Sequence, residues 1–333
     1  MQAFYVVGGR QRAPRSVLEQ DEAWQGYDQG LVLHVEAESG EVSTAFTYVS
    51  PPDVVADDGA VSFQASTLHD GLLYTCTETE VMVYTLPGFE RLEYVSLPCF
   101  NDVHHVRRSL RGNFLVANAG LEMVVEVTPQ GEIVEALSTL GEDPWAGFDR
   151  TVDYRKIDTK PHRAHPNYVF YLGEEVWATR FEQGDAISLS PAGRSVDVSS
   201  ERIHDGLLHE GRIYFTTVDG KIVVVDAHSL ERLETIDLTG FHRDRSLLGW
   251  CRGILVDGDR LWVGFSRIRP TRFRANVGWA SRGFRHSKPT HIACYDLARR
   301  ECLTEIDLEP AGLSALYSIL PAGRSNDVTA RGR

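Results

Sequence analysis

From about residue 60 to the end of the chain, apolar segments of strand length recur at short intervals, separated by turns rich in Gly, Asp, Asn and Pro. Within these segments, β-branched and aromatic residues alternate with polar ones, as in strands that bury one face. Segments with a helical period are nearly absent from the sequence. The pattern therefore predicts an all-β protein built from short antiparallel strands.

One stretch defines a repeating unit. Residues 203–238 contain HDGLLHEG, RIYFTTVDG, KIVVVDAHSLE and RLETIDL, which predicts four antiparallel strands joined by tight turns. Four strands of this kind form one blade of a β-propeller. Similar units begin at four other places, covering 62–97, 104–137, 166–199 and 251 onward, the last resuming at THIACYDLARRECLTEIDL.

The remaining blade is divided between the two ends of the chain. Pairing of the first and last strands would close the ring and remove the exposed edges that promote aggregation. The sequence thus predicts one domain over residues 1–333, a closed six-bladed β-propeller; a seventh blade would need extra strands within 8–30. The strands of the divided blade are predicted, from the inner to the outer one, at 315–320, 4–7, 31–37 and 42–49.

Three long irregular stretches interrupt the repeat, at 8–30, 138–165 and 267–289. In a propeller, the connections between blades lie on the same face as the turns between second and third strands. All three stretches fall in these two classes of connection. We therefore expect them to form a lid over one mouth of the channel, since long loops often carry function.

Polar residues recur near the start of the predicted inner strands. When these strands are aligned by their closing turns, the equivalent positions are Gln64, His105, Asn167, His204 and Arg252, with Leu316 or Tyr317 in the divided blade. His165 precedes Asn167 by one strand period, and Arg180 ends the next strand on the same face. Hydrated polar groups can simply line a tunnel, but clustered titratable groups must each be desolvated or paired, which favours a functional site.

Charge narrows the range of ligands. The chain has 333 residues and a formal net charge of −13, which argues against binding of duplex nucleic acid. The stretch 267–289 is an exception, because it has seven basic residues and no acidic one. It is either a solvated basic loop or a site for a small anionic or aryl substrate, since arginine binds sulfate, phosphate or carboxylate in a bidentate manner. The arginines predicted to bind substrate are Arg267, Arg269, Arg272 and Arg274.

Several common signals are missing from the sequence. The five cysteines are scattered and lack a CxxC pair, which argues against a disulfide framework or a zinc knuckle. No apolar segment approaches membrane-spanning length, and the first residues lack the features of a signal peptide. We therefore expect a soluble, cytoplasmic protein with reduced cysteines and no membrane partner. The oligomeric state stays open.

Three segments resemble successive blades of the bacterial arylsulfotransferase propellers, namely FNDVHHVRRSLRGNFLVAN, HPNYVFYLGEEVWATRF and HDGLLHEGRIYF. The resemblance covers about residues 100–215, and the chain also resembles short bacterial propellers of unknown function with a WCRG…WVGFSR blade. It implies that His204 is a nucleophile that carries a sulfuryl group, without a cofactor. The residues it implies as binding the sulfuryl oxygens are His105, His165, Asn167 and Arg180.

Two other interpretations stay open. His105, His165 and His204 come from three consecutive predicted blades, and such a set could hold zinc, copper or iron. Against this, Arg180 and Arg252 would repel a cation, and neither Asp102 nor Asp205 is predicted to point into the channel. The other alternative is a non-catalytic binding or scaffold protein, because a propeller fold does not determine function.

Overall fold

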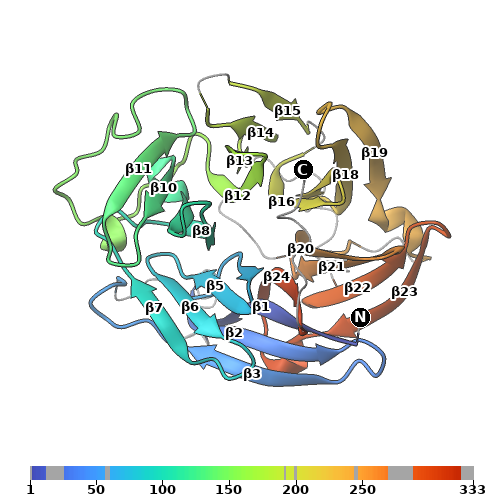
Figure 1. Ribbon diagram of the computed structural model, residues 1–333. Coiled ribbons are helices and arrows are strands. Elements are labelled where there is room, and N and C mark those ends of the chain that lie inside the picture. Colours follow the sequence, from blue (N-terminus) through green and yellow to red (C-terminus); the bar gives the residue numbers. More distant parts are fainter. Residues whose placement is uncertain are drawn as a thin grey trace.

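The computed structural model describes residues 2–12, 26–56, 61–190, 193–198, 201–243, 247–268 and 288–323. In these residues, six antiparallel sheets of four strands each are arranged in a ring (Figure 1). This arrangement confirms the predicted all-β, six-bladed β-propeller. The helices among the described residues are short 3-10 turns, and none has the length and apolar character needed to cross a membrane.

The strands follow the predicted repeat closely, and the inner strands β24, β4, β8, β12, β16 and β20 surround the central channel (Figure 1). Blade 1 contains β24 (Ala315–Pro321), β1 (Ala3–Gln11), β2 (Tyr27–Glu36) and β3 (Val42–Tyr48). Blade 2 contains β4 (Thr67–His69), β5 (Leu72–Cys76), β6 (Val81–Thr85) and β7 (Arg91–Val95). Blade 3 contains β8 (Val103–Arg108), β9 (Phe114–Asn118), β10 (Met123–Val127) and β11 (Ile133–Ser138).

The other three blades complete the ring. Blade 4 contains β12 (Pro166–Leu172), β13 (Glu175–Arg180), β14 (Asp185–Ser188) and β15 (Ser195–Asp197). Blade 5 contains β16 (Ile203–His209), β17 (Arg212–Thr217), β18 (Lys221–Asp226) and β19 (Arg232–Asp237). Blade 6 contains β20 (Trp250–Asp257), β21 (Arg260–Ser266), β22 (His291–Asp296) and β23 (Glu301–Asp307).

The ring closes within blade 1 as predicted. The last strand, β24, pairs with the first, β1, and the register places Tyr5 opposite Leu320 and Val6 opposite Ile319. β1 and β2 extend further than expected, to Gln11 and from Tyr27, so part of the stretch 8–30 is a long hairpin rather than irregular loop. Its tip, 13–25, lies outside the described residues.

Apolar side chains fill the spaces between neighbouring blades. At the closing junction, Phe4 of blade 1 lies against Trp262 of blade 6, with ring centroids 4.7 Å apart. Both are part of one buried cluster that spans the two blades. Each blade buries its faces against its neighbours, so an opened ring would expose a strip of core. All five cysteines are free thiols, four of them buried in this packing.

We call the end of the channel at which the inner strands begin the channel mouth. Most inner strands have an irregularity in their pairing near this end. In β8, β12, β16, β20 and β24, the pairing with the next strand shifts by one residue. Such a β-bulge inserts a residue, bends the strand and changes the direction in which side chains point. The alternation that holds along the rest of each strand therefore does not continue through the mouth.

Only part of the predicted lid can be placed. The stretch 138–165 first runs along the outer edge of the propeller, where Trp145 and Phe148 pack against the core between blades 2 and 3. Residues 157–165 then return to the channel mouth. The stretch 267–289 was also predicted to form part of the lid, but most of it, residues 269–287, lies outside the described residues.

Candidate functional site

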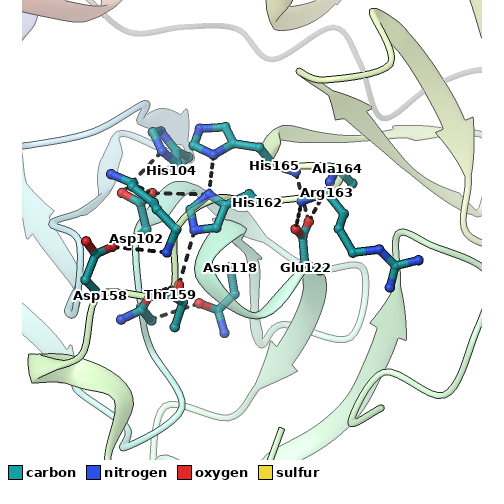
Figure 2. A network of polar contacts seen from close by, with 12 residues as sticks. Asp102, His104, Asn118, Glu122, Asp158, Thr159, His162, Arg163, Ala164 and His165 are labelled. Atoms are coloured by element: carbon teal, nitrogen blue, oxygen red, sulfur yellow. Dashed lines mark hydrogen bonds and ion pairs between the residues drawn. The ribbon is translucent and has the colours of Figure 1, made fainter. Parts of the chain in front are cut away.

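Four titratable side chains meet at the mouth between blades 3 and 4, and we call them the histidine cluster: Asp102, His104, His162 and His165 (Figure 2). Asp102 and His104 belong to the start of β8, and the other two to the returning loop. The Nδ1 atoms of His162 and His165 are 2.6 Å apart. Asp102 lies beside both histidines of blade 3 and the loop, 3.5 Å from His104 Nε2 and 3.7 Å from His162 Nδ1.

Hydrogen bonds determine which nitrogen of His162 carries its proton. The amide of Asn101 donates to the carbonyls of Tyr154 and Ile157, so its oxygen must accept. That oxygen accepts from the Thr159 hydroxyl at 2.8 Å. The same hydroxyl lies 3.2 Å from His162 Nε2 and is left to accept, which makes Nε2 a donor. The lone pair of His162 is therefore on Nδ1 and points into the cluster.

A buried carboxylate holds the loop that carries His162 and His165. Glu122, in the turn between β9 and β10, accepts hydrogen bonds from the backbone N–H groups of Arg163, Ala164 and His165, the last two at 2.9 Å (Figure 2). Glu122 and His165 both have left-handed backbones, with φ of 57° and 54°. Such conformations are costly for residues other than glycine and persist where surrounding contacts fix them.

The charges of the cluster follow from burial and from its neighbours. Burial opposes ionisation of Asp102, but His104 and the Lys160 ammonium outweigh it and hold the pKa of this carboxyl well below its usual range. Burial lowers the pKa of His165 well below its usual value, with a further contribution from His104, and burial also lowers the pKa of His162. At neutral pH the carboxylate of Asp102 therefore lies beside the neutral imidazoles of His162 and His165.

A second group of side chains lies at the mouth between blades 5 and 6. His204 Nδ1 lies 3.0 Å from the Cys251 carbonyl, which can only accept, so Nδ1 carries the proton. Its Nε2 accepts from Arg252 Nε at 3.2 Å. Burial, followed by the charge of Arg252, lowers the pKa of His204 well below its usual value. The guanidinium of Arg252 also lies 4.8 Å from the ring centroid of Tyr317.

One aromatic ring links the two groups. The centroid of Phe181 is 5.3 Å from that of His165 and 5.3 Å from that of His204. His165 and His204 were both predicted from the sequence to lie at the mouth, and in the structure both are close to this ring. The predicted Asn167 is near them, because its amide donates to the carbonyl of Ile203 at 3.1 Å.

The prediction that His105 lies at the channel mouth is wrong. The structure places His104, rather than His105, in the cluster with His165. His105 is fully buried between blades 3 and 4, where it stacks on Tyr168 at 3.8 Å and accepts the N–H of Val169 at 3.1 Å. The bulge between Val103 and His105 shifts the alternation, so counting from the far end of the strand selected the wrong neighbour.

The predicted arginines are mostly engaged with carboxylates. Arg180 forms a two-point pair with Asp185, at 2.8 and 2.5 Å, and donates to the Thr139 carbonyl. Arg267 lies 3.3 Å from Glu309. Arg269, Arg272 and Arg274 lie outside the described residues. Arg252, which was predicted as a catalytic residue, donates to His204.

Gln64 belongs to a polar group on blade 2 that includes a residue not predicted from the sequence. Its amide donates to Ser62 at 3.0 Å and to the carboxylate of Glu78 at 2.8 Å. Burial raises the pKa of Glu78 to about 7, although the hydroxyl of Ser62 opposes the shift. Glu78 lies in the turn between β5 and β6, one of the connections on the face of the mouth, and its position there was the available signal.

Two expectations about metal ligands are also corrected. The ligand atoms of His105, His165 and His204 do not converge. Among the described residues, the potential metal ligands that do converge at the mouth are Asp102, His162 and His165. Asp102 points into that group, contrary to expectation, because it lies at the bulged start of β8. Asp205 does point away: it accepts from Thr216 at 2.6 Å and from the Gly253 N–H at 2.9 Å.

Comparison with known proteins supports the fold alone. No family model and no curated protein matches the chain. A protein of unknown function from Bacteroides caccae matches with a TM-score of 0.60 and 12% identity, over 96% of this chain and 98% of that one. A chain from a nidogen/laminin complex matches with a TM-score of 0.57 and 8% identity, over 96% and 99% of the two chains. These identities show a shared propeller architecture.

Proposed function

We propose that this protein is an enzyme that transfers an anionic group of the sulfuryl type to or from a small aryl substrate at the channel mouth. The observation that carries this proposal is the pair of His204 and Arg252, in which a neutral imidazole with a defined tautomer faces a guanidinium. The resemblance of the segment HDGLLHEGRIYF to the arylsulfotransferase propellers implies a nucleophilic role for the same histidine.

Substrate binding would itself activate this nucleophile. Arg252 now donates to the lone pair of His204, which is a neutral acceptor. An anionic substrate competes well for the guanidinium, because it carries the opposite charge and can accept two parallel N–H bonds, whereas the imidazole accepts only one. When Arg252 turns to the anion, the lone pair of His204 Nε2 becomes available beside it. Tyr317 and Phe181 border the same space and offer faces for an aryl ring.

The reaction would proceed in two displacements. His204 Nε2 attacks the sulfur of an aryl sulfate, the N–S bond forms, and the bond from sulfur to the aryl oxygen breaks, so that a phenolate leaves with the electron pair. A second phenol then attacks the sulfur and breaks the N–S bond, which restores the imidazole. The proton of the attacking phenol passes to water in this step.

A direct test uses a nitrophenyl sulfate as donor and a phenol as acceptor, and measures release of nitrophenolate by the purified full chain. We expect His204→Ala to reduce turnover by at least about three orders of magnitude, as removal of a nucleophile does in other two-step enzymes. A matched control is His209→Ala, because His209 ends the same strand at the opposite end of the channel and is partly exposed. This variant should retain turnover.

Two results would contradict the proposal. If His204→Ala turned over the donor as fast as the wild type, the imidazole would not be the nucleophile. If the wild type bound aryl sulfates tightly but released no nitrophenolate over many hours, the protein would be a binding module rather than an enzyme.

A further inference from the structure

We infer that the histidine cluster is a binding site for one divalent transition-metal ion, with Asp102, His162 and His165 as ligands and His104 as a fourth. The carboxylate of Asp102 and the ring nitrogens of His162 and His165 present ligand atoms that all lie within 4.8 Å of one another. The inference does not depend on the proposed reaction at His204, which is not one of the proposed ligands.

The donor set fits a particular class of ion. Imidazole nitrogen suits zinc, iron and the neighbouring transition metals, whereas magnesium and calcium prefer oxygen ligands. Two or three histidines with one carboxylate are typical of sites that leave a coordination position open for water or substrate. The cluster contains no thiolate, so a site of the structural zinc type, which is usually rich in cysteine, fits less well.

Neighbouring residues orient the ligands as they do in metal sites. The hydrogen bonds of Asn101 and Thr159 place the proton of His162 on Nε2, and the lone pair of Nδ1 points inward. Metal-binding histidines commonly donate their second N–H in this manner. The carboxylate of Glu122 holds the backbone of Ala164 and His165, which fixes the loop that supplies two of the ligands.

Two buried atoms of the cluster point to a missing ligand. Asp102 Oδ2 and His104 Nε2 are inaccessible to solvent, and neither forms a hydrogen bond with any residue that the structure describes. A buried carboxylate oxygen and a buried ring nitrogen without partners are costly. His104 Nε2 lies 3.5 Å from the other oxygen of this carboxylate. One cation would satisfy both groups if the proton of His104 is on Nδ1, because Nε2 then offers its lone pair.

Two features oppose the ion, and both can be relieved. Lys160 Nζ lies 3.4 Å from Asp102 Oδ2 and would repel a cation, but its side chain is 52% exposed and can turn to solvent. The facing nitrogens of His162 and His165 are 2.6 Å apart, whereas two nitrogens bound to one tetrahedral zinc are about 3.4 Å apart. The rings must therefore separate slightly. A cavity of about 210 Å³, lined in part by Thr159, His162 and Arg163, offers space beside them and a path for entry.

A second group of potential ligands serves as an internal control. His242, Cys302 and Glu305 also lie close together in blade 6 and the segment before it. There, however, Lys288 Nζ lies 3.2 Å from His242 Nδ1 and 2.5 Å from Glu305, so an ammonium already occupies the space between them. We therefore expect the histidine cluster to bind the ion and the blade 6 group to leave it unbound.

The experiment is a titration of the metal-free full chain with Zn²⁺, followed by calorimetry, and with Co²⁺, followed by visible absorption. We expect one ion per chain and d–d bands of cobalt without a thiolate charge-transfer band. Asp102→Asn and His162→Ala should abolish this binding, and Thr159→Val should weaken it by about 10–100-fold through the tautomer of His162. Lys160→Met should strengthen binding, and Cys302→Ser should leave it unchanged.

Clear outcomes would overturn the inference. One is a wild type that binds neither ion at micromolar concentration; another is binding that Cys302→Ser removes while Asp102→Asn and His162→Ala do not. If Asp102→Asn and His162→Ala fail to fold, the cobalt spectrum of the wild type and the affinity of Lys160→Met for the ion still test the inference. Because no substrate is present, loss of metal binding can be distinguished from loss of the reaction proposed at His204.

Discussion

Two junctions between blades carry comparable pairs of residues at the start of an inner strand: His104 and His105 in blade 3, and His204 and Asp205 in blade 5. The first member of each pair faces the mouth, where the ring of His104 lies 4.6 Å from that of His165 and His204 contacts Arg252. The second member turns toward the next blade and accepts a backbone N–H there, from Val169 or from Gly253. Both pairs lie at the bulges of their strands, where the direction of the side chains changes.

The difference between the second members shows that residue type does not identify function in this channel. At one junction the N–H of the next blade is accepted by the neutral imidazole of His105, which stacks on Tyr168. At the other it is accepted by the buried carboxylate of Asp205, which also accepts from Thr216. His105 therefore connects two blades, whereas His204 belongs to the site. Only the partners of a histidine, and not its presence in the inner strand, distinguish a structural residue from a candidate catalytic one.

The comparison predicts its largest effect on stability for His105→Ala. This change would leave a cavity beside Tyr168 and the N–H of Val169 without an acceptor, at a cost of about 3 kcal/mol. His104→Ala, its partly exposed neighbour, should cost about 1 kcal/mol or less. Urea denaturation of both variants measures the difference. Equal stability losses would show that the two histidines do not divide their roles in this manner.

The same pair of residues marks the limit of prediction from the sequence. The blades and the closure of the ring could be predicted, because alternation and turns recur in every unit and because 315–320 and 4–7 each lacked a partner. The site could be predicted only to within one residue. Five of the six inner strands contain a bulge near the mouth, and nothing in the alternation around His104 and His105 indicates which of them is the inserted residue.

Other members of the site depend on contacts that no local pattern contains. His162 acquires its role from Thr159 and Asn101, and Asn101 is held in turn by carbonyls of a 3-10 turn (Tyr154–Lys156) and of Ile157. Glu122 and Glu78 come from turns of different blades, and each is buried by contacts with a separate segment of the chain. The sequence indicates that these turns lie on one face, but not which of their carboxylates is buried.

The second prediction concerns the buried carboxylate that blade 5 uses in place of an imidazole. Burial raises the pKa of Asp205 from 3.8 to about 6. Between these values the folded protein keeps the proton that the unfolded chain has released, so stability falls as the pH rises from about 4 to 6. The decrease should reach up to about 3 kcal/mol. Asp205→Asn should remove this contribution in urea denaturation measured across the range, whereas the contribution of Glu78, whose pKa is also raised, should remain.

A suitable control for that measurement is Glu90→Gln, which changes an exposed carboxylate in a turn of blade 2. Its stability profile should follow that of the wild type. If Asp205→Asn retained the full fall in stability between pH 4 and 6, the dependence would come from other groups, and burial would not raise the pKa of Asp205.

The smallest effect, and the most specific, is expected on the titration of the two buried histidines. Burial is the main cause that lowers the pKa of both His204 and His105, but the next cause differs, being Arg252 for His204 and Arg107 for His105. Arg252→Gln removes a positive charge that disfavours the imidazolium, so the pKa of His204 should rise while that of His105 stays low. Arg252→Lys keeps the charge and should leave both low. Nitrogen-detected NMR titration of the ring signals follows the pKa of each histidine separately. If the pKa of His204 were unchanged in Arg252→Gln, burial alone would keep this imidazole neutral. Arg252 would then have no part in controlling the charge of the nucleophile.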